Sequence, residues 1–208
     1  MSVDAGVNAT RTTPEQRRTA LKRVAVALKG SGVPFALAGG YAAWVHGAPE
    51  PVHDVDFDVR PQDAERVAEH LREQGFTVEQ PPEDWLFKVL SDGVLVDVLH
   101  RGGGLPVDDA LLARAAVVEV LSVEMPVIAP TDVVAHKLCA FDEHTCDFAP
   151  ALRVTRSIRE SVDWDEVRER TAGRPFAEAF LHLLGLLDVV PPARGAGGDP
   201  QRATERAG

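Results

Sequence analysis

The segment VHDVDFDV at 52–59 constrains the fold of this chain more than any other feature of the sequence. Apolar and acidic residues alternate along it, and a period of two predicts a β-strand with two different faces. The apolar side chains would pack into a core, while Asp54, Asp56 and Asp58 would share the other face. Aspartate is a poor strand former and neighbouring carboxylates repel one another, so convergence of these three residues requires a compensating partner.

A lone aspartate, Asp97, interrupts a second apolar run at 93–99, which is typical of a fully buried strand. A carboxylate inside such a strand costs several kcal/mol unless it is paired or bound to a cation. The alternatives are that the acidic face of 52–59 is a solvated edge, and that Asp97 pairs with an arginine or a backbone group. Taken together, the two strands favour a divalent-metal site, and carboxylate oxygens suit Mg²⁺.

Gly39 and Gly40 follow a short apolar run at 34–38 and precede a predicted helix at 41–46. Glycine lets the backbone approach a ligand closely, and a helix N-terminus presents free N–H groups to an anion. A plain tight turn is the alternative explanation. Beside the acidic strand, the pair predicts a phosphate cradle next to a metal site, which is the layout that nucleotide chemistry needs.

Helix and strand signals alternate up to residue 130, and the pattern is helical from 131 onward. This predicts an α/β (α+β) protein with a flexible tail at 1–12, an α/β domain at 13–130, a C-terminal helical region at 131–190 and a disordered tail at 191–208. Thr13 and Thr131 are predicted N-caps, and Gly102, Gly103 and Gly104 a flexible break. Further strands are predicted at 76–79, 85–90, 117–121 and 125–128, and helices after Thr13 and at 61–74, 108–114, 132–140, 150–161, 163–170 and 176–187.

Charge and composition exclude several classes of protein. A net charge of -10 speaks against a generic nucleic-acid coat, because such binding needs a strong positive field. Two cysteines among 208 residues exclude a disulfide-stapled scaffold. No apolar stretch reaches the roughly 18 residues of a transmembrane helix, and the N-terminal residues lack the apolar core of a signal peptide, so we expect a cytoplasmic protein with no membrane partner.

Together these pieces resemble the nucleotidyltransferase (polymerase-β-like) superfamily. The resemblance is carried by a strand, Gly-Gly and a helix, followed by Asp-Val-Asp-Phe and a later Leu-Val-Asp-Val. The segments LAGGYAAWVHG, HDVDF and APTDVVAHKLCA look most like small bacterial members of the abortive-infection and toxin type. The resemblance covers residues 33–150 and implies a mixed sheet flanked by helices.

The resemblance also implies roles for the aspartates. Asp54 and Asp56 match the first two metal-binding carboxylates of the family. Asp97 matches the third, which is a metal ligand and also activates the incoming hydroxyl. The implied cofactor is Mg²⁺, as two ions, with Mn²⁺ as the alternative.

Nucleotide-binding residues follow in the same way. Gly39 and Gly40 match the phosphate loop of the family, and Lys137 matches a helix lysine that contacts the triphosphate. Lys88 lies on a predicted strand between the two acidic strands. We interpret it as a further phosphate contact, with a lysine that snorkels at a sheet edge as the alternative.

Three departures from the family pattern favour an alternative function. Gly40 stands where many relatives have serine, and Glu50-Pro51-Val52 replaces a common Arg-x-Thr/Ser sequence. A basic segment after the lysine helix is replaced by His-Thr-Cys-Asp at 144–147, which leaves only its aspartate. The alternative is a catalytically silent nucleotide- or partner-binding module on the same fold, whereas retention of all three aspartates favours the enzyme.

His136, Cys139, His144 and Cys146 invite a zinc interpretation. Their spacings do not match common zinc modules, so a buried cysteine and a helix-packing histidine are preferred.

Arg153, Arg156 and Arg159 recur every three residues and predict a basic stripe on one helix. A solvated face is the default interpretation, and a nucleotide- or RNA-facing stripe is the alternative.

We therefore predict a metal-dependent nucleotidyltransferase that moves NMP from an NTP to an acceptor hydroxyl. The acceptor is a small molecule, a protein or tRNA. The negative net charge favours a small molecule or a protein over tRNA, whereas salt-dependent tRNA binding would indicate a toxin-like enzyme.

Overall fold

The computed structural model describes residues 12–191, so the predictions for 1–11 and 192–208 lie outside the described residues. Helix α1 (Pro14–Gly30) begins where the sequence predicts a helix. The Thr13 hydroxyl accepts a hydrogen bond from the Gln16 N–H at 3.2 Å, and the Gln16 side chain accepts one from the Thr13 N–H at 2.8 Å. This capping box satisfies two backbone groups that a helix end leaves free.

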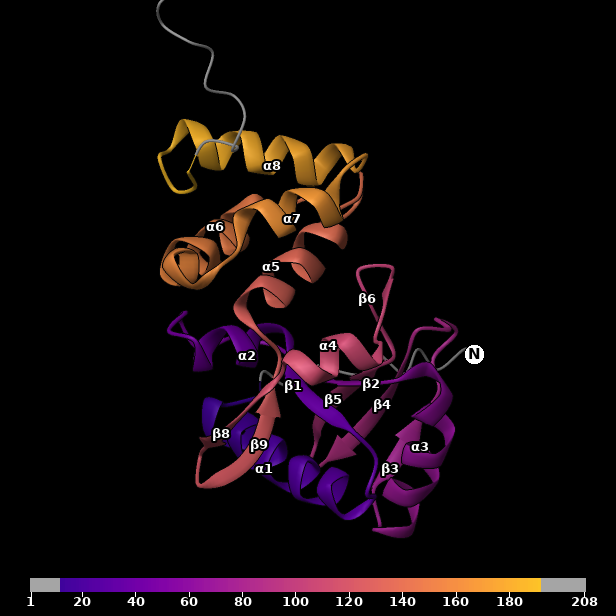
Figure 1. The fold of residues 1–208 in the computed structure, drawn as a ribbon. Helices are drawn as coiled ribbons and strands as arrows, with labels where there is room; N and C mark the ends of the chain where they lie inside the picture. Colours follow the sequence, from indigo (N-terminus) through magenta and orange to yellow (C-terminus); the bar gives the residue numbers. More distant parts are fainter. Residues whose placement is uncertain (1–11, 192–208) are drawn as a thin grey trace, which may run out of the picture.

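A seven-stranded mixed sheet forms the base of the molecule (Figure 1), in the order β3-β4-β5-β2-β1-β9-β8. The pairs β2–β5 and β1–β9 are parallel, and the other pairs are antiparallel. Helices flank this sheet, which confirms the predicted fold class. The strands are β1 (Phe35–Ala38), β2 (Val55–Val59), β3 (Thr77–Glu79), β4 (Leu86–Ser91), β5 (Val94–Leu99), β8 (Ala116–Val120) and β9 (Val123–Val127).

The helices pack on the sheet and in a stack above it (Figure 1). Helices α1 and α3 pack against each other and against strands, and α5 leads from β9 into the stack formed with α6, α7 and α8. The helices after α1 are α2 (Gly39–Val45), α3 (Ala64–Glu73), α4 (Asp109–Arg114), α5 (Pro130–Cys139), α6 (Phe148–Ile158), α7 (Trp164–Thr171) and α8 (Pro175–Leu186), with short 3-10 turns at Pro61–Asp63 and Arg159–Ser161.

The register of the central strands brings the two acidic segments together. Asp56 on β2 lies opposite Ala38 on β1 and opposite Asp97 on β5. Lys88 on β4 lies opposite Asp97 in turn. Because directly opposed residues point to the same face of a sheet, the two aspartates and the lysine form one row. On the other face, Phe57 is fully buried in a core to which α1 contributes.

The predicted strand at 52–59 is shorter than expected, and Asp54 is wrongly placed in it. Strand β2 begins at Val55, and Asp54 is exposed just before it. The physical reason is that β1 ends at Ala38, opposite Asp56, so no strand residue of β1 is left to pair with Asp54.

The strand that carries Asp97 is buried on one face only, which corrects the expectation of a fully buried strand. Val94, Val96 and Val98 are buried, whereas Leu95 is 45% exposed. Asp97 shares the more open face. Helix α1 packs against β5, whose three valines are buried in the core to which α1 contributes.

The glycines at 102–104 form part of a hairpin rather than a flexible break. Strands β6 (Arg101–Gly102) and β7 (Leu105–Pro106) pair antiparallel. Gly103 and Gly104 have φ of 57° and 80°, and two successive positive φ values are what a two-residue hairpin turn requires.

Thr131 is not an N-cap, because α5 already begins at Pro130, with Ala129 as its N-cap. Proline is preorganised for the first helical position, which moves the helix start towards the N-terminus. The Thr131 hydroxyl instead accepts a hydrogen bond from the Asp163 N–H at 2.9 Å. Across residues 12–191, no helix is both long and apolar enough to cross a membrane.

Candidate functional site

Asp56 is the centre of the candidate site. It lies on β2 where the sheet meets α2 and α5, and its carboxyl group is only partly accessible. Burial raises the pKa of Asp56 to about 7, and the charges of Asp54 and Asp97 push it the same way. Lys137 and the backbone N–H of Gly40 oppose the shift. Four of the predicted site residues thus surround one carboxyl group.

Gly39 is required for this arrangement. Its φ is 55°, and a Cβ at this position would overlap Oδ2 of Asp56. Any side chain at 39 would therefore displace the carboxyl group.

Two departures from the family pattern prove to be spatial neighbours. A Cβ on Gly40 would lie 2.8 Å from Cβ of Pro51, which is too close for a real contact. Gly40 and Pro51 therefore fit together. The first replaces the serine of many relatives, and the second replaces part of their usual sequence before the aspartates.

Helix α1 holds the loop that leads to Asp54. Arg18 forms a bidentate ion pair with Glu50, at 2.6 and 2.8 Å. Arg17, which is buried, donates to the backbone oxygen of Pro51 at 3.4 Å. Tyr41 adds a hydrogen bond to Glu50 at 3.3 Å. The side chain of Glu50 thus fixes the position of the loop. The sequence did not predict a role for this residue.

Asp97 is paired with Lys88. Nζ of Lys88 lies 2.9 Å from Oδ1 and 3.2 Å from Oδ2 of the carboxylate. The side chains are 31% and 20% exposed, so the pair lies at the edge of the site rather than within the core. Lys88 is therefore bound to the third carboxylate, whereas a phosphate contact was predicted for it.

A cavity of about 570 Å³ opens beside Asp56, between the sheet, α5 and the β6–β7 hairpin. Of the predicted site residues, Gly39, Asp56 and Lys137 line it. Gly40, Asp54, Asp97 and Lys88 do not. Its other walls are Ala38, Asp58, Trp85, Leu99, Arg101, Gly102, Gly103, Gly104, Ile128, Val133, His136, Cys139, Ala140 and Asp142.

Two polar residues in these walls, Asp58 and His136, were not among the predicted catalytic, nucleotide-binding or metal-binding residues. Burial raises the pKa of Asp58 well above its usual value, and the charges of Asp56 and Asp132 add to the shift. Burial, together with the charge of Arg170, lowers the pKa of His136 to about 4. The alternating pattern at 52–59 predicts that Asp58 shares a face of the sheet with Asp56. No pattern in the sequence predicts that His136 on α5 lies near Asp58.

Buried arginine contacts hold α5 against its neighbours. Asp132 is fully buried, and Arg114 and Arg170 bind it at 2.6 and 2.7 Å. Burial alone would raise the pKa of Asp132, but these hydrogen bonds hold it below the usual value. Arg174 donates to the backbone oxygens of Gly103 at 3.0 Å and Cys139 at 2.8 Å, which joins the hairpin to α5.

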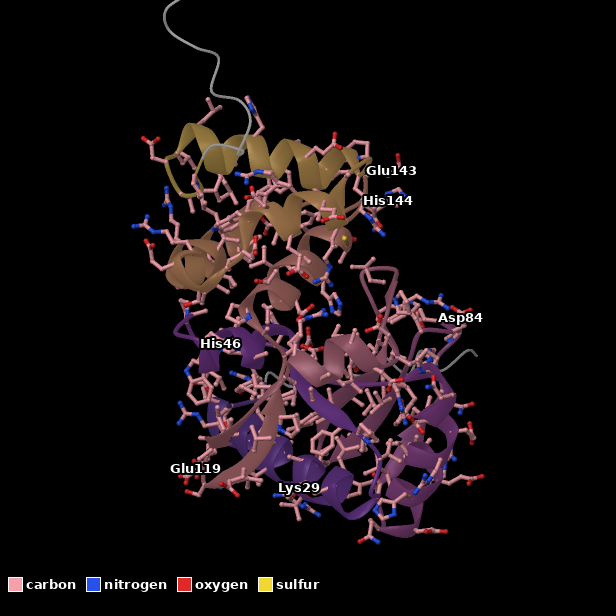
Figure 2. All side chains as sticks on the ribbon, in the orientation of Figure 1. Lys29, His46, Asp84, Glu119, Glu143 and His144 are labelled. Atoms are coloured by element: carbon pink, nitrogen blue, oxygen red, sulfur yellow. The ribbon has the colours of Figure 1, made fainter. Side chains whose placement is uncertain are left out.

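The four residues of the zinc interpretation are scattered. Cys139 is buried and its thiol donates to the backbone oxygen of Arg170 at 3.8 Å, while Cys146 is exposed. Figure 2 shows His144 beside Glu143 at the outer surface of the helical stack. Within the described part of the chain, no three His, Cys, Asp or Glu side chains form a metal-binding group.

Asp54 and Asp56 nevertheless fit a magnesium ion. Asp56 is crowded by two further carboxylates, and a cation would relieve this repulsion. Mg²⁺ is usually held by one or two carboxylates together with substrate phosphates, so three protein ligands are not needed. The donor set therefore suits a cation that a nucleotide helps to hold.

The predicted basic stripe lies on the surface. Arg153, Arg156 and Arg159 are exposed on and just after α6, and Arg159 pairs with Glu160 at 2.9 Å. Asp147, the residue left from the basic segment of relatives, caps α6 by accepting from the Ala149 N–H at 3.0 Å.

Solved structures of low sequence identity share this fold. ANT(2″)-Ia, in a crystal structure with adenylyl-2″-tobramycin, is 13% identical with a TM-score of 0.55, covering 80% of this chain and 97% of that one. An antigenic nucleotidyltransferase-like protein from Paracoccidioides brasiliensis is 12% identical with a TM-score of 0.55, covering 85% of this chain and 91% of that one. No curated protein matches.

A family model decides the family. The family described as an uncharacterised nucleotidyltransferase matches residues 7–193, which is nearly the whole chain. The match extends beyond 33–150, the range of the resemblance found in the sequence, and includes the helical stack. The chain therefore belongs to this nucleotidyltransferase family, and the predicted superfamily is confirmed.

Proposed function

We propose that this protein transfers a nucleoside monophosphate from an NTP to an acceptor hydroxyl, with Mg²⁺ as cofactor. The observation that carries the proposal is the surroundings of Asp56. Two carboxylates, a lysine and a glycine N–H act on this one carboxyl group beside a cavity of about 570 Å³. Carboxylates for a cation and positive groups for phosphates are what NTP chemistry requires.

The residues divide the work in this proposal. Asp54 and Asp56 would hold the cation, and Lys137 with Gly39 and Gly40 would bind the triphosphate. The chemistry supplied by Mg²⁺ held there would be neutralisation of phosphate charge, which would make the α-phosphorus a better electrophile.

Asp97 accepts the proton of the acceptor hydroxyl. The hydroxyl oxygen then forms a bond to the α-phosphorus, the bond from that phosphorus to the bridging oxygen breaks, and pyrophosphate leaves. Lys88 orients the carboxylate through its two contacts.

A small molecule or a protein is our proposed acceptor. The net charge of -10 opposes the many phosphate contacts that tRNA binding needs. Adenylyl-2″-tobramycin in the structure of ANT(2″)-Ia supports a small molecule, by analogy of fold alone. We further propose that the reaction takes place in the cytoplasm.

A silent nucleotide-binding module is the second candidate. It is favoured by Gly40. This glycine packs against Pro51, which leaves no room for the serine that many relatives have at this position. A side-chain hydroxyl at this position is therefore not available to a phosphate.

The experiment incubates the full chain with each NTP labelled at the α-phosphate, Mg²⁺, and either total cell RNA or a cell lysate. We expect a labelled product and pyrophosphate release. Asp56→Asn should abolish both, and Asp92→Asn, which changes an exposed aspartate at the β4–β5 turn, should not. Nucleotide binding without labelled product from any fraction would establish the silent module.

A further inference from the structure

The ion pair of Lys88 and Asp97 lies next to Asp56 in the sheet. Asp97 is directly opposite Asp56, and Lys88 is directly opposite Asp97 on the next strand. Both carboxylate oxygens of Asp97 accept from the Lys88 ammonium group, at 2.9 and 3.2 Å. A carboxylate whose two oxygens already contact a positive charge is poorly suited to hold a metal ion, because the ion would be repelled by the ammonium group beside it.

The sheet keeps Lys88 at this position. Strands β4 and β5 pair along six successive residues, and Lys88 and Asp97 are partners in the middle of that ladder. Directly opposed residues have Cβ atoms about 5 Å apart. The pair therefore does not depend on a loop, and Lys88 can leave Asp97 only by rotation of its own side chain.

One other carboxylate neighbours Lys88 in the sheet. Glu79 on β3 is directly opposite Lys88 on its other side. Glu79 is exposed, and among residues 12–191 the structure shows no ion pair between Glu79 and Lys88. The lysine is thus bound to the carboxylate at the site rather than to the one at the edge of the sheet.

The remaining carboxylates suit a single ion. Asp56 lines the cavity, whereas Asp97 and Lys88 lie outside its walls. In the part of the chain that the structure describes, no three His, Cys, Asp or Glu side chains form a metal-binding group, so Asp54, Asp56 and Asp97 do not converge on one point. Mg²⁺ is usually held by one or two carboxylates together with substrate phosphates. Asp54 and Asp56 meet that requirement without Asp97.

We propose that Lys88 takes the place of a second metal ion, so that the nucleotide complex of this protein holds one divalent cation, at Asp54 and Asp56. Asp97 then binds no metal, and Lys88 is a positioning residue that sets the direction of its carboxylate. The inference rests on the proposed function, because it takes the nucleotide and the first cation from there. It departs from the two ions that the family resemblance implies.

The test counts bound Mn²⁺, which replaces Mg²⁺, by electron paramagnetic resonance. The full chain is saturated with each of the four α,β-methylene NTPs, whose bridge between the α- and β-phosphorus does not cleave, and is titrated with Mn²⁺. We expect the wild type to bind one Mn²⁺ per chain, with the spectrum of an isolated ion. Two ions in a shared site lie roughly 3.5–4 Å apart, so their signals would show magnetic coupling.

Removal of the ammonium group should double the count. Lys88→Met should bind a second Mn²⁺ that is coupled to the first. Lys88→Gln, which keeps a hydrogen-bond donor but loses the charge, should behave in the same way and serves if the methionine variant does not fold. Addition of Asp97→Asn to either variant should return the count to one, because the second ion then loses its carboxylate.

The matched control is Lys22→Met. Lys22 is exposed on α1 and lies outside the walls of the cavity beside Asp56. This variant removes the same charge from the chain and should still bind one Mn²⁺.

The outcomes separate this inference from the proposed function. Two coupled ions in the wild type overturn the inference alone, and a count of one in Glu79→Gln would then show that Lys88 moves to Glu79. One ion in the wild type and in both Lys88 variants also overturns the inference, because the lysine does not limit the count. One ion in the wild type and two in the variants, without transfer of a labelled monophosphate, support the inference and contradict the proposed transferase. If no Mn²⁺ binds in any nucleotide complex, both fail.

Discussion

The ammonium group of Lys88 lies 2.9 Å from Oδ1 and 3.2 Å from Oδ2 of Asp97, its direct neighbour across the paired strands β4 and β5. The third carboxylate of the site is thus paired in the protein itself. Removal of an unpaired carboxylate would relieve strain, whereas removal of Asp97 breaks this pair.

Asp97→Asn should therefore destabilise the protein slightly and inactivate it. The pair is only partly buried, so the loss in the free energy of unfolding is about 1 kcal/mol or less. Nucleotide transfer should fall by roughly a hundredfold or more, because a general base is lost. Urea denaturation and a transfer assay check the two parts. A loss of roughly 3–5 kcal/mol would show a structural ion pair instead.

Mg²⁺ and NTP together should stabilise the protein more than the sum of their separate effects. Each helps to hold the other at Asp54 and Asp56, and ligands that bind only the folded state raise the melting temperature by mass action. Asp56→Asn should abolish the synergy, which thermal melts with each ligand alone and with both will reveal. Equal stabilisation by NTP with and without Mg²⁺ would contradict the metal assignment.

Acid should destabilise the protein through His136. Its folded pKa of about 4 is below the ordinary value of 6.5, so the unfolded state binds a proton first as the pH falls. The stabilisation is complete above pH 6.5 and is lost as the pH falls towards 4. Between pH 8 and pH 5 the wild type should lose about 2 kcal/mol more than His136→Leu in urea denaturation. Parallel pH curves for the two proteins would show that the imidazole titrates normally.

Replacing the two arginines that bind Asp132 should lower the free energy of unfolding far more than replacing all three charged residues. In Arg114→Met/Arg170→Met the fully buried carboxylate loses its partners, at a cost of roughly 3–5 kcal/mol in the free energy of unfolding. Adding Asp132→Leu should recover most of that loss, since no buried charge is left. Urea denaturation of the double and triple variants checks this, and equal stability of the two would refute it.

The stripe of Arg153, Arg156 and Arg159 should contribute little to substrate binding. Each phosphate contact to RNA gives a slope of about -0.7 to -0.9 in log K against log salt. We expect weak tRNA binding with the same slope for the wild type and the triple alanine variant in filter-binding assays. Tight binding with a steep slope that the variant loses would identify a toxin-like enzyme acting on tRNA.

The row formed by Asp56 and Asp97 across the sheet could be predicted from the sequence, because it depends on patterns within short segments. Alternation along 52–59 set the face of Asp56, and the family resemblance related it to Asp97. The error at Asp54 arose because the length of β2 depends on where β1 ends, which alternation within one segment does not contain.

Contacts between distant segments explain the rest. The pairing of Lys88 with Asp97 depends on the register of β4 against β5. The juxtaposition of Asp58 and His136 depends on how α5 packs over the sheet, and α5 is fixed by arginines from α4 and α7. None of these spacings is periodic in the sequence, so pattern analysis had nothing to detect.

The way the β6–β7 hairpin is attached allows the cleft to change size during evolution. Arg174 contacts carbonyl oxygens of the main chain, which are present whatever side chains occupy those positions. Insertions in the turn could lengthen the wall over the cavity while Asp97, upstream on β5, keeps its register with Asp56. The wall formed by the hairpin and the row of Asp56 and Asp97 are therefore structurally independent of each other, because the first is held through main-chain contacts and the second through strand register.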